Sequence, residues 1–383
     1  MHQKTVALVA ALVFAAVVPF GAVGAPASDA TETAVSPAST TLATQEDCAF
    51  PVTRTDGTGT EVTLEEPPER IVAIGGSTPQ VMWELGVQDR VVGMPVQSYT
   101  AYLNGSENKT DVVTQDGAVD QEQVVALQPD LVVLANIYSN ETAQSLRAAG
   151  LTVYKEDFPS TLAGITRSVD TYGALTGACD QAEQTNEQFD ASIDAIDADA
   201  ETFDSPRVFY YFFNFTAGSG TFTDELITTA GGTNVAAEAG VTGFRQVNLE
   251  IVAEQDPEVV VVPSDSSVPT GEPWNSTTAY QEGNIVRVDT NLAQQPAPRV
   301  IGPIRTMQEA FAAAAQSTPT PEQTTVAATT APPTDATFTT TAPAEDDDQQ
   351  TPAADSSGDG AGFGLASALV ALAAAALLAT RRR

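Results

Sequence analysis

Short apolar runs alternate with helical patterns along most of the chain, and this alternation constrains the fold more than any other feature. Residues 71–74 are continuously apolar, as expected for a strand that a parallel sheet buries on both faces. A helical pattern follows and ends at Gly86, a residue type common after helix ends. Strands that alternate with helices predict parallel sheets covered by helices on both faces.

The alternation occurs twice, on either side of a segment without strands. We expect a hairpin at 52–64, with Asp56-Gly57 between its two strands. Further strands are expected at 70–74, 90–93, 131–134, 151–154, 207–213, 259–262 and 285–288. Helices are expected at 120–127, 141–149, 180–201, 224–230, 249–254 and 299–315. The sequence therefore predicts an α/β molecule of two lobes, each a parallel-type sheet flanked by helices, with a helical spine between them and a cleft.

The two halves share one repeated unit. Glu122-x6-Pro129-Asp130 opens the strand 131–134, and Glu250-x6-Pro257-Glu258 opens the strand 259–262. Each Glu lies where a helix begins, and a carboxylate is favourable there for the helix alone. The matching spacing also fits two equivalent carboxylates, one per lobe, that dock on a two-fold partner with paired arginines.

The chain is strongly acidic, with 16 Lys+Arg against 50 Asp+Glu and a formal net charge of −34. Residues 48–315 hold 38 acidic and 12 basic side chains, a net charge of −26. Such a surface repels itself unless salt screens it, which favours a protein from a high-salt cell over one with ordinary solvated acidic faces. The charge also argues against binding nucleic acid through a basic groove.

Catalytic chemistry has little support in the sequence. The only histidine is His2, in a segment expected to be removed, so Ser-His-Asp, Cys-His and imidazole–zinc sites are not expected. There is no Gly-rich loop of the P-loop type. We therefore expect a binding protein without a catalytic site, a resident metal or a cofactor.

Both ends of the chain look like targeting segments. Lys4, the apolar run 6–18 and Ala25-Pro26-Ala27 predict a cleaved signal peptide rather than a core helix. Near the other end, 363–379 is an apolar run followed by Arg381-Arg382-Arg383, which predicts a membrane anchor with a cytoplasmic end. With Gly360-Ala361-Gly362-Phe363 before it, this layout resembles the sorting tail of haloarchaeal surface proteins, although Ala361 replaces the expected Pro.

The remaining segments follow from composition. Residues 316–360 are rich in Thr, Pro and acid and have no periodic apolar face, which predicts a disordered stalk. Cys48 and Cys179, the only cysteines, favour a disulfide outside the cell over a metal or redox site. The expected organisation is a signal peptide (1–27), a linker (28–47), an N-terminal α/β lobe (48–160), connecting helices (161–202), a C-terminal α/β lobe (203–315), the stalk (316–360) and a sorting motif with a transmembrane anchor (361–383).

Several motifs in this order and spacing resemble the substrate-binding proteins of ABC importers for cobalamin and ferric siderophores, the class III periplasmic-binding-protein fold. They are Pro68-x-Arg70-Ile71-Val72, Leu85-Gly86-x-x-x-Arg90-Val91-Val92-Gly93, the two Glu-x6-Pro units, Gly231-Gly232-x-Asn234 and Pro298-Arg299. The resemblance covers about 48–315. It implies two lobes joined by a long rigid helix, with a metal chelate held in the interlobe cleft, and it makes Glu122 and Glu250 the carboxylates that dock on permease arginines.

The resemblance also points to residues of the cleft. Tyr99 and Tyr138 match the lip of the N-terminal lobe, and Phe215, Phe244 and Arg245 match that of the C-terminal lobe. Aromatic rings there would pack on a flat macrocycle or the apolar face of a siderophore, and Arg245 would pair with a ligand oxygen, although ordinary packing or a surface role is the alternative for each. The tryptophans expected around a corrin ring are missing, because Trp83 is expected in a helix core and Trp274 in a surface turn.

The leading hypothesis is an extracellular substrate-binding component of an ABC importer, held at the outer face of the cell membrane by its C-terminal segment or by a lipid that replaces it. Its expected partners are a permease dimer with its ATPase and a corrinoid or ferric siderophore, and the protein itself is expected to be a monomer. The alternatives are a non-transport cell-surface or adhesion protein on the same scaffold and, with least support, an enzyme.

Overall fold

The computed structural model describes residues 48–157 and 161–317, and its strands are short and mostly parallel. The strands are β1 (Val52–Thr55), β2 (Glu61–Leu64), β3 (Ile71–Ile74), β4 (Val91–Met94), β5 (Thr110–Asp111), β6 (Leu131–Leu134), β7 (Val153–Lys155), β8 (Arg207–Tyr210), β9 (Phe215–Ala217), β10 (Thr233–Asn234), β11 (Phe244–Gln246), β12 (Val259–Pro263) and β13 (Ile285–Val288). The helices are α1 (Ser77–Glu84), α2 (Gln121–Ala126), α3 (Asn140–Ala148), α4 (Leu162–Thr176), α5 (Cys179–Ala200), α6 (Phe222–Thr229), α7 (Val235–Glu238), α8 (Leu249–Gln255), α9 (Thr278–Glu282), α10 (Thr290–Ala293) and α11 (Ile301–Ser317).

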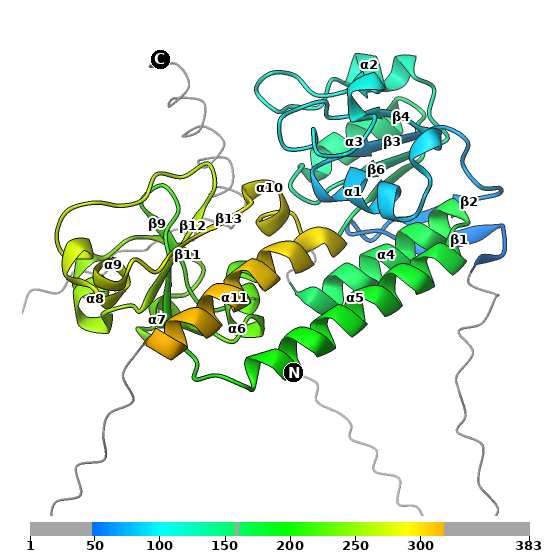
Figure 1. The fold of residues 1–383 in the computed structure, drawn as a ribbon. Helices are drawn as coiled ribbons and strands as arrows, with labels where there is room; N and C mark the ends of the chain where they lie inside the picture. Colours follow the sequence, from blue (N-terminus) through cyan, green and yellow to red (C-terminus); the bar gives the residue numbers. More distant parts are fainter. Residues whose placement is uncertain (1–47, 158–160, 318–383) are drawn as a thin grey trace, which may run out of the picture. The chain divides into compact units, whose positions relative to one another are not determined.

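Two separate parallel sheets confirm the predicted fold class (Figure 1). The first has the order β5-β4-β3-β6-β7 and the second the order β10-β8-β12-β13, with every neighbouring pair parallel. All four residues of β3 are fully buried, as are the four valines of β12. The apolar runs form strands because helices on both sides of each sheet remove their side chains from water.

The predicted hairpin is β1–β2, which pairs in antiparallel register from Val52↔Leu64 to Thr55↔Glu61. Its turn is fixed to the first sheet, because the amide of Gly57 donates to the carbonyl of Lys155 at 2.8 Å. The buried carboxylate of Asp56 also forms an ion pair with Arg147. These contacts join the entry of the described chain to the last strand of the first sheet.

Helices α4 and α5 occupy the strand-free segment and lie side by side (Figure 1). Helix α5 is in contact with α1 and α4 on one hand and with α6 and α11 on the other, so it links elements from both halves of the chain. One hydrophobic cluster accordingly contains Ile71 of the first sheet, Phe189 of α5 and Val261 of the second sheet. The predicted long connecting helix is α5, and α4 is its partner.

The disulfide joins Cys48 to Cys179 with a Cα–Cα distance of 6.2 Å, as predicted. It ties the start of the described chain to the first residue of α5. Among the helices at 48–157 and 161–317, none combines the length and the apolarity that crossing a membrane requires. The predicted signal peptide, linker and membrane anchor, and the stalk beyond Ser317, lie outside the described residues.

Two expectations about single elements are wrong, and a third, the core position of Trp83 on α1, holds only in part because its ring packs against the core without being fully buried. Strand β8 ends at Tyr210 rather than at 213, because Phe213 and Asn214 have φ angles of +44° and +68° that turn the chain. Trp274 is buried rather than in a surface turn: its ring packs edge-on against Phe209 at 5.4 Å between centroids. Trp83 is only half-buried, and its indole N–H donates to the carbonyl of Asn104 at 2.9 Å.

Candidate functional site

Two predicted tyrosines meet at the carboxyl edge of the first sheet. Tyr99 follows β4, Tyr138 follows β6, and Asp111 is the last residue of β5. Burial raises the pKa of Tyr138 to about 12, and the charge of Asp111 adds to the effect. Burial also raises the pKa of Tyr99, with further contributions from Tyr138 and Asp111. The three residues follow or end strands of one sheet at its carboxyl edge, where open α/β sheets bind ligands.

Sequence reasoning missed Asp111, which organises this edge. Its carboxylate accepts hydrogen bonds from the side chain of Gln97 at 2.8 Å and from the backbone amides of Val96 at 3.1 Å and Val113 at 3.2 Å. The signal in the sequence was weak, because β5 is only two residues long. Asp111 is itself exposed, so its carboxylate also faces solvent beside the two phenols.

The predicted residues of the C-terminal half lie on a two-stranded antiparallel ribbon that the sequence did not predict. Strand β9 begins with Phe215, and β11 begins with Phe244 and Arg245. The register pairs Phe244 with Ala217, Arg245 with Thr216 and Gln246 with Phe215. Side chains alternate between the faces of a ribbon, so Phe215 and Phe244 share one face and Arg245 lies on the other. The register therefore places the two rings on the face opposite the guanidinium, and the ring of Phe244 packs partly buried against the main hydrophobic cluster.

The turn before this ribbon is strained. Phe213 and Asn214 are consecutive residues with positive φ, a conformation that Asn tolerates and a bulky residue such as Phe rarely adopts. The amide of Phe213 donates to the hydroxyl of Ser266 at 3.1 Å, and Phe212 and Phe215 exchange backbone hydrogen bonds at 2.9 and 2.7 Å. Backbone strain of this kind concentrates at functional sites, and here it follows the carboxyl end of β8.

The repeated unit has the same hydrogen bonds in both halves. Asp130 accepts from the backbone amide of Arg70 at 2.8 Å, and the Arg70 guanidinium donates to the carbonyl of Leu127 at the end of α2. In the second half, Glu258 accepts from the backbone amide of Arg207 at 2.8 Å. The Arg207 guanidinium donates to the carbonyl at the end of α8. The acid after each Pro therefore binds the backbone beside the neighbouring strand, and the arginine there binds the end of the helix.

This leaves Glu122 and Glu250 as the free carboxylates of the two units. Both are the second residue of a short helix, α2 or α8, and both are exposed. The N-caps are Asp120 and Asn248, whose side chains accept from backbone amides at 3.0 Å. Since other side chains cap these helices, neither Glu is required for that purpose. Within 48–157 and 161–317, neither carboxylate is in a hydrogen bond or ion pair.

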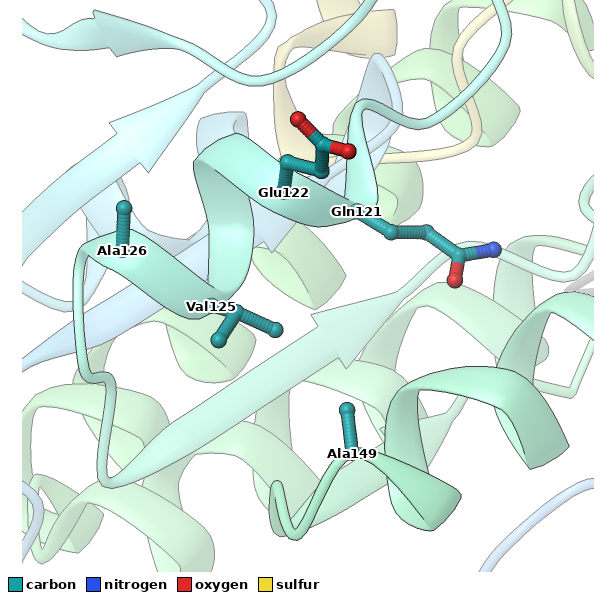
Figure 2. Close-up of a pocket in the computed structure, with 5 residues that line it drawn as sticks. All are labelled: Gln121, Glu122, Val125, Ala126 and Ala149. Atoms are coloured by element: carbon teal, nitrogen blue, oxygen red, sulfur yellow. The ribbon is translucent and has the colours of Figure 1, made fainter.

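Apolar surface lies beside each predicted functional region. The exposed large hydrophobic residues in the described chain are Val125, Ile137 and Leu249. Val125 is one turn after Glu122, Leu249 precedes Glu250, and Ile137, 56% exposed, precedes Tyr138. Figure 2 shows a shallow hollow lined by Val125, Ala126 and Ala149, with the Glu122 carboxylate extending away from Ala149. Exposed apolar side chains rimmed by polar residues are typical of binding surfaces.

Metal chemistry from the protein itself has no visible support here. Across the described ranges, no group of three or more His, Cys, Asp or Glu side chains is placed to hold a metal ion. Both cysteines form the disulfide, so neither has a free thiol.

Comparisons with known proteins identify the family of the chain. A family model described as periplasmic binding protein matches residues 71–292. The cobalamin-binding protein of Halobacterium salinarum is 38% identical over 278 residues, which cover 69% of this chain and 75% of that protein.

Two solved structures show the same fold. The apo periplasmic heme-binding protein of Roseiflexus sp. RS-1 superposes with a TM-score of 0.59 at 25% identity, covering 65% of this chain and 99% of that chain. The periplasmic vitamin B12-binding protein of Vibrio cholerae has a TM-score of 0.57 and covers 66% of this chain and 99% of that chain. Its identity is 19%, so this likeness concerns the fold alone. Because the family model matches more than half of the chain and a 38% identical relative covers more than two thirds of it, the chain belongs to the periplasmic binding protein family.

Proposed function

We propose that this chain is the extracellular substrate-binding component of an ABC importer and that its ligand is a corrinoid. The observation that carries the proposal is the 38% identity with a cobalamin-binding protein over most of both chains. The acidic composition, with a formal net charge of −34, is what we expect of a protein from a high-salt cell. In this account the chain captures the ligand outside the cell and delivers it to a permease, and the metal is part of the cargo.

The side chains at the carboxyl edge of the first sheet and on the β9–β11 ribbon favour a corrinoid over haem, because the protein would have to supply a ligand to the haem iron. Haem iron is usually held by His, Cys, Met or Tyr side chains. The described chain contains no His, and its cysteines form a disulfide. The methionines Met82, Met94 and Met307 are buried in the core. Among the predicted cleft residues only Tyr99 and Tyr138 could bind iron, but burial raises the pKa of both phenols and so opposes the phenolate that iron would need. A corrinoid needs no such ligand.

The side chains at these two places could contact a broad ring that has an apolar face and amide groups around its edge. Phe215 and Phe244 offer rings on one face of the β9–β11 ribbon, and Ile137 offers exposed apolar surface at the first sheet. The phenols of Tyr99 and Tyr138 and the carboxylate of Asp111 provide donors and acceptors for amides. Few polar groups within an apolar surround are typical of small-molecule sites.

Delivery requires a second surface, for which Glu122 and Glu250 are the candidates. Each is a free carboxylate beside an exposed aliphatic side chain, Val125 or Leu249. Arginine pairs well with carboxylates and packs its stem on apolar surface. A permease with arginines at two equivalent points fits both surfaces, whereas an adhesion protein on the same scaffold needs neither carboxylate.

A titration calorimetry series on the full-length chain in molar salt tests the ligand. Cyanocobalamin, haem and a ferric hydroxamate are compared as probes. We expect cyanocobalamin to bind most tightly, and Phe244→Ala or Tyr138→Ala to weaken its binding by about 1–3 kcal/mol. Arg245→Ala is the internal control, because its side chain lies on the other face of the ribbon. If haem or the ferric hydroxamate binds more tightly than cyanocobalamin, the proposed corrinoid ligand is wrong.

A further inference from the structure

A chain of hydrogen bonds connects the second half of the protein to the tyrosine edge of the first. The side-chain amide of Gln295 donates to the backbone carbonyl of Tyr99 at 2.9 Å. The hydroxyl of Tyr102 donates to the side-chain carbonyl of Gln295 at 2.9 Å and accepts from the amide of Gln80 at 2.7 Å. We call these four residues the Gln295 network. Gln295 is 196 residues from Tyr99 in the sequence.

The network is buried, and its hydrogen bonds determine which way each side chain points. Gln80 is fully buried and Gln295 is 8% exposed. Both ends of the Gln295 amide are used, and the Gln80 carbonyl accepts from the backbone amide of Arg299 at 2.9 Å. Rotating the Gln295 amide by 180° would place its oxygen against the carbonyl of Tyr99. Buried polar networks with all partners present specify a unique arrangement, and a partly satisfied network is unfavourable.

The backbone of the first half is shaped to admit Gln295. A Cβ atom on Gly76 would lie 2.7 Å from Cδ and 3.0 Å from Nε2 of Gln295. Gly76 has φ −88° and ψ −48°, values that any residue can adopt. The absence of a side chain at Gly76 therefore serves the approach of Gln295 rather than an unusual backbone conformation.

A second contact holds the same two segments together. The guanidinium of Arg299 pairs with the carboxylate of Glu84 on α1. It also lies over the ring of Tyr102, with its central carbon 5.6 Å from the ring centroid. The segment 295–299 is thus fixed to α1 and to the loop at 97–103 by hydrogen bonds, charge and a cation–π contact.

We infer that Gln295 is a positioning residue, which sets Tyr99 at the ligand-binding edge from the other half of the chain. This inference rests on the proposed function, because Tyr99 is assigned there to the ligand. Since Gln295 holds the backbone of Tyr99 rather than its ring, its effect on a ligand passes through the position of the 97–103 loop. The phenol of Tyr99 then meets the ligand already oriented, which limits the entropy lost on binding.

The test combines hydrogen exchange without ligand and a double-mutant cycle with cyanocobalamin, on the full-length chain in molar salt. Gln295→Leu removes both hydrogen bonds at similar volume, and Gln184→Leu, an exposed residue of α5, is the matched control. Gly76→Ala displaces Gln295 while leaving it in the sequence, and it serves if Gln295→Leu fails to fold. We expect amides at 97–103 to exchange about tenfold faster in either network variant, with no change in the control.

In the cycle, Gln295→Leu should weaken cyanocobalamin binding about tenfold in the wild-type background and have little effect when Tyr99 is already replaced by Ala. Unchanged exchange at 97–103, or an affinity loss that is fully additive with Tyr99→Ala, would overturn the inference. If the wild-type chain binds no cyanocobalamin, the proposed ligand fails, and the exchange measurement still decides whether Gln295 positions the loop.

Discussion

At the scale of single residues, Glu156 is the side chain whose environment most alters its chemistry. It follows β7 and is almost completely buried. Burial raises its pKa from the usual 4.5 to about 7, and the charge of Asp157 adds to the rise, whereas the hydroxyl groups of Tyr172 and Ser168 and the charge of Lys155 oppose it. The folded protein therefore binds a proton at this site in a pH range where the unfolded chain has released it.

The sign of the resulting pH dependence is fixed. Between pH 4.5 and 7 the folded state holds more protons at Glu156 than the unfolded state, so the free energy of unfolding falls as pH rises. We expect a loss on the order of 3 kcal/mol across that range and none in Glu156→Gln. Urea unfolding at fixed salt from pH 4.5 to 8 measures it, and parallel profiles for the two proteins would contradict it.

The carboxylate of Asp56 affects the free energy of unfolding at a lower pH than Glu156 does. Burial raises its pKa, but hydrogen bonds from Thr58, Lys155 and Thr60 outweigh burial, and the net pKa lies below 3.8. Its stabilising contribution is present above that value and is lost as pH falls through the lower pKa of the folded state. Because the two carboxyl groups titrate in different pH ranges, one series of unfolding measurements against pH distinguishes their effects on stability.

At the scale of elements, α2 and α8 are equivalent in position and in chemistry. Each ends with a non-glycine residue at positive φ, Gln128 or Asp256, directly before the Pro of the repeated unit. Because Asp130 and Glu258 bind the backbone of the neighbouring strand, the remaining acid of each unit is available for a partner.

Charge reversal on these two helices tests that reading. Glu122→Lys with Glu250→Lys should leave cyanocobalamin affinity unchanged and abolish uptake in cells, because rim charges govern association with a partner more than the fold. The matched control is Glu187→Lys with Glu238→Lys, two exposed acids of α5 and α7 whose reversal changes the net charge equally. Normal uptake by the first double variant would rule out the docking role.

Elements with strong local signals were predictable from the sequence, and those made by distant pairing were not. The runs 71–74 and 131–134 identify themselves by continuous apolarity, which only a doubly covered strand allows. Strands β9 and β11 have three residues each and pair across two intervening helices and a strand, so no local alternation marks them. Trp274 lies between turn-forming residues, and its burial depends on Phe209, 65 positions earlier. Gln295 likewise has no local signal for its contact with Tyr99.

At the scale of the whole molecule, acidic charge dominates. Residues 48–315 carry a net charge of −26, and α5 alone places Asp190, Asp194 and Asp197 within successive turns. Burial raises the pKa of Asp197, and the charges of Asp194 and Glu201 add to it. Like charges three and four residues apart on a helix destabilise it, so we expect the stability of the described chain to depend on screening by salt.

We therefore expect the melting temperature to fall steeply below roughly 0.5 M salt, where the screening length increases. Replacing Asp190, Asp194 and Asp197 together with Asn should make the salt dependence shallower. Calorimetric scans from about 0.1 to about 3 M NaCl, which span the range over which salt screens these charges, measure both proteins. A melting temperature independent of salt would contradict the expectation.

The central claim is that a corrinoid binds between the carboxyl edge of the first sheet and the β9–β11 ribbon. Hydrogen exchange of the full-length chain, with and without cyanocobalamin in molar salt, tests it most directly. We predict slower exchange at 96–102, 136–138, 213–217 and 244–246, with α2 and α8 unchanged. Protection confined to α2 and α8, or no protection anywhere, would contradict the account.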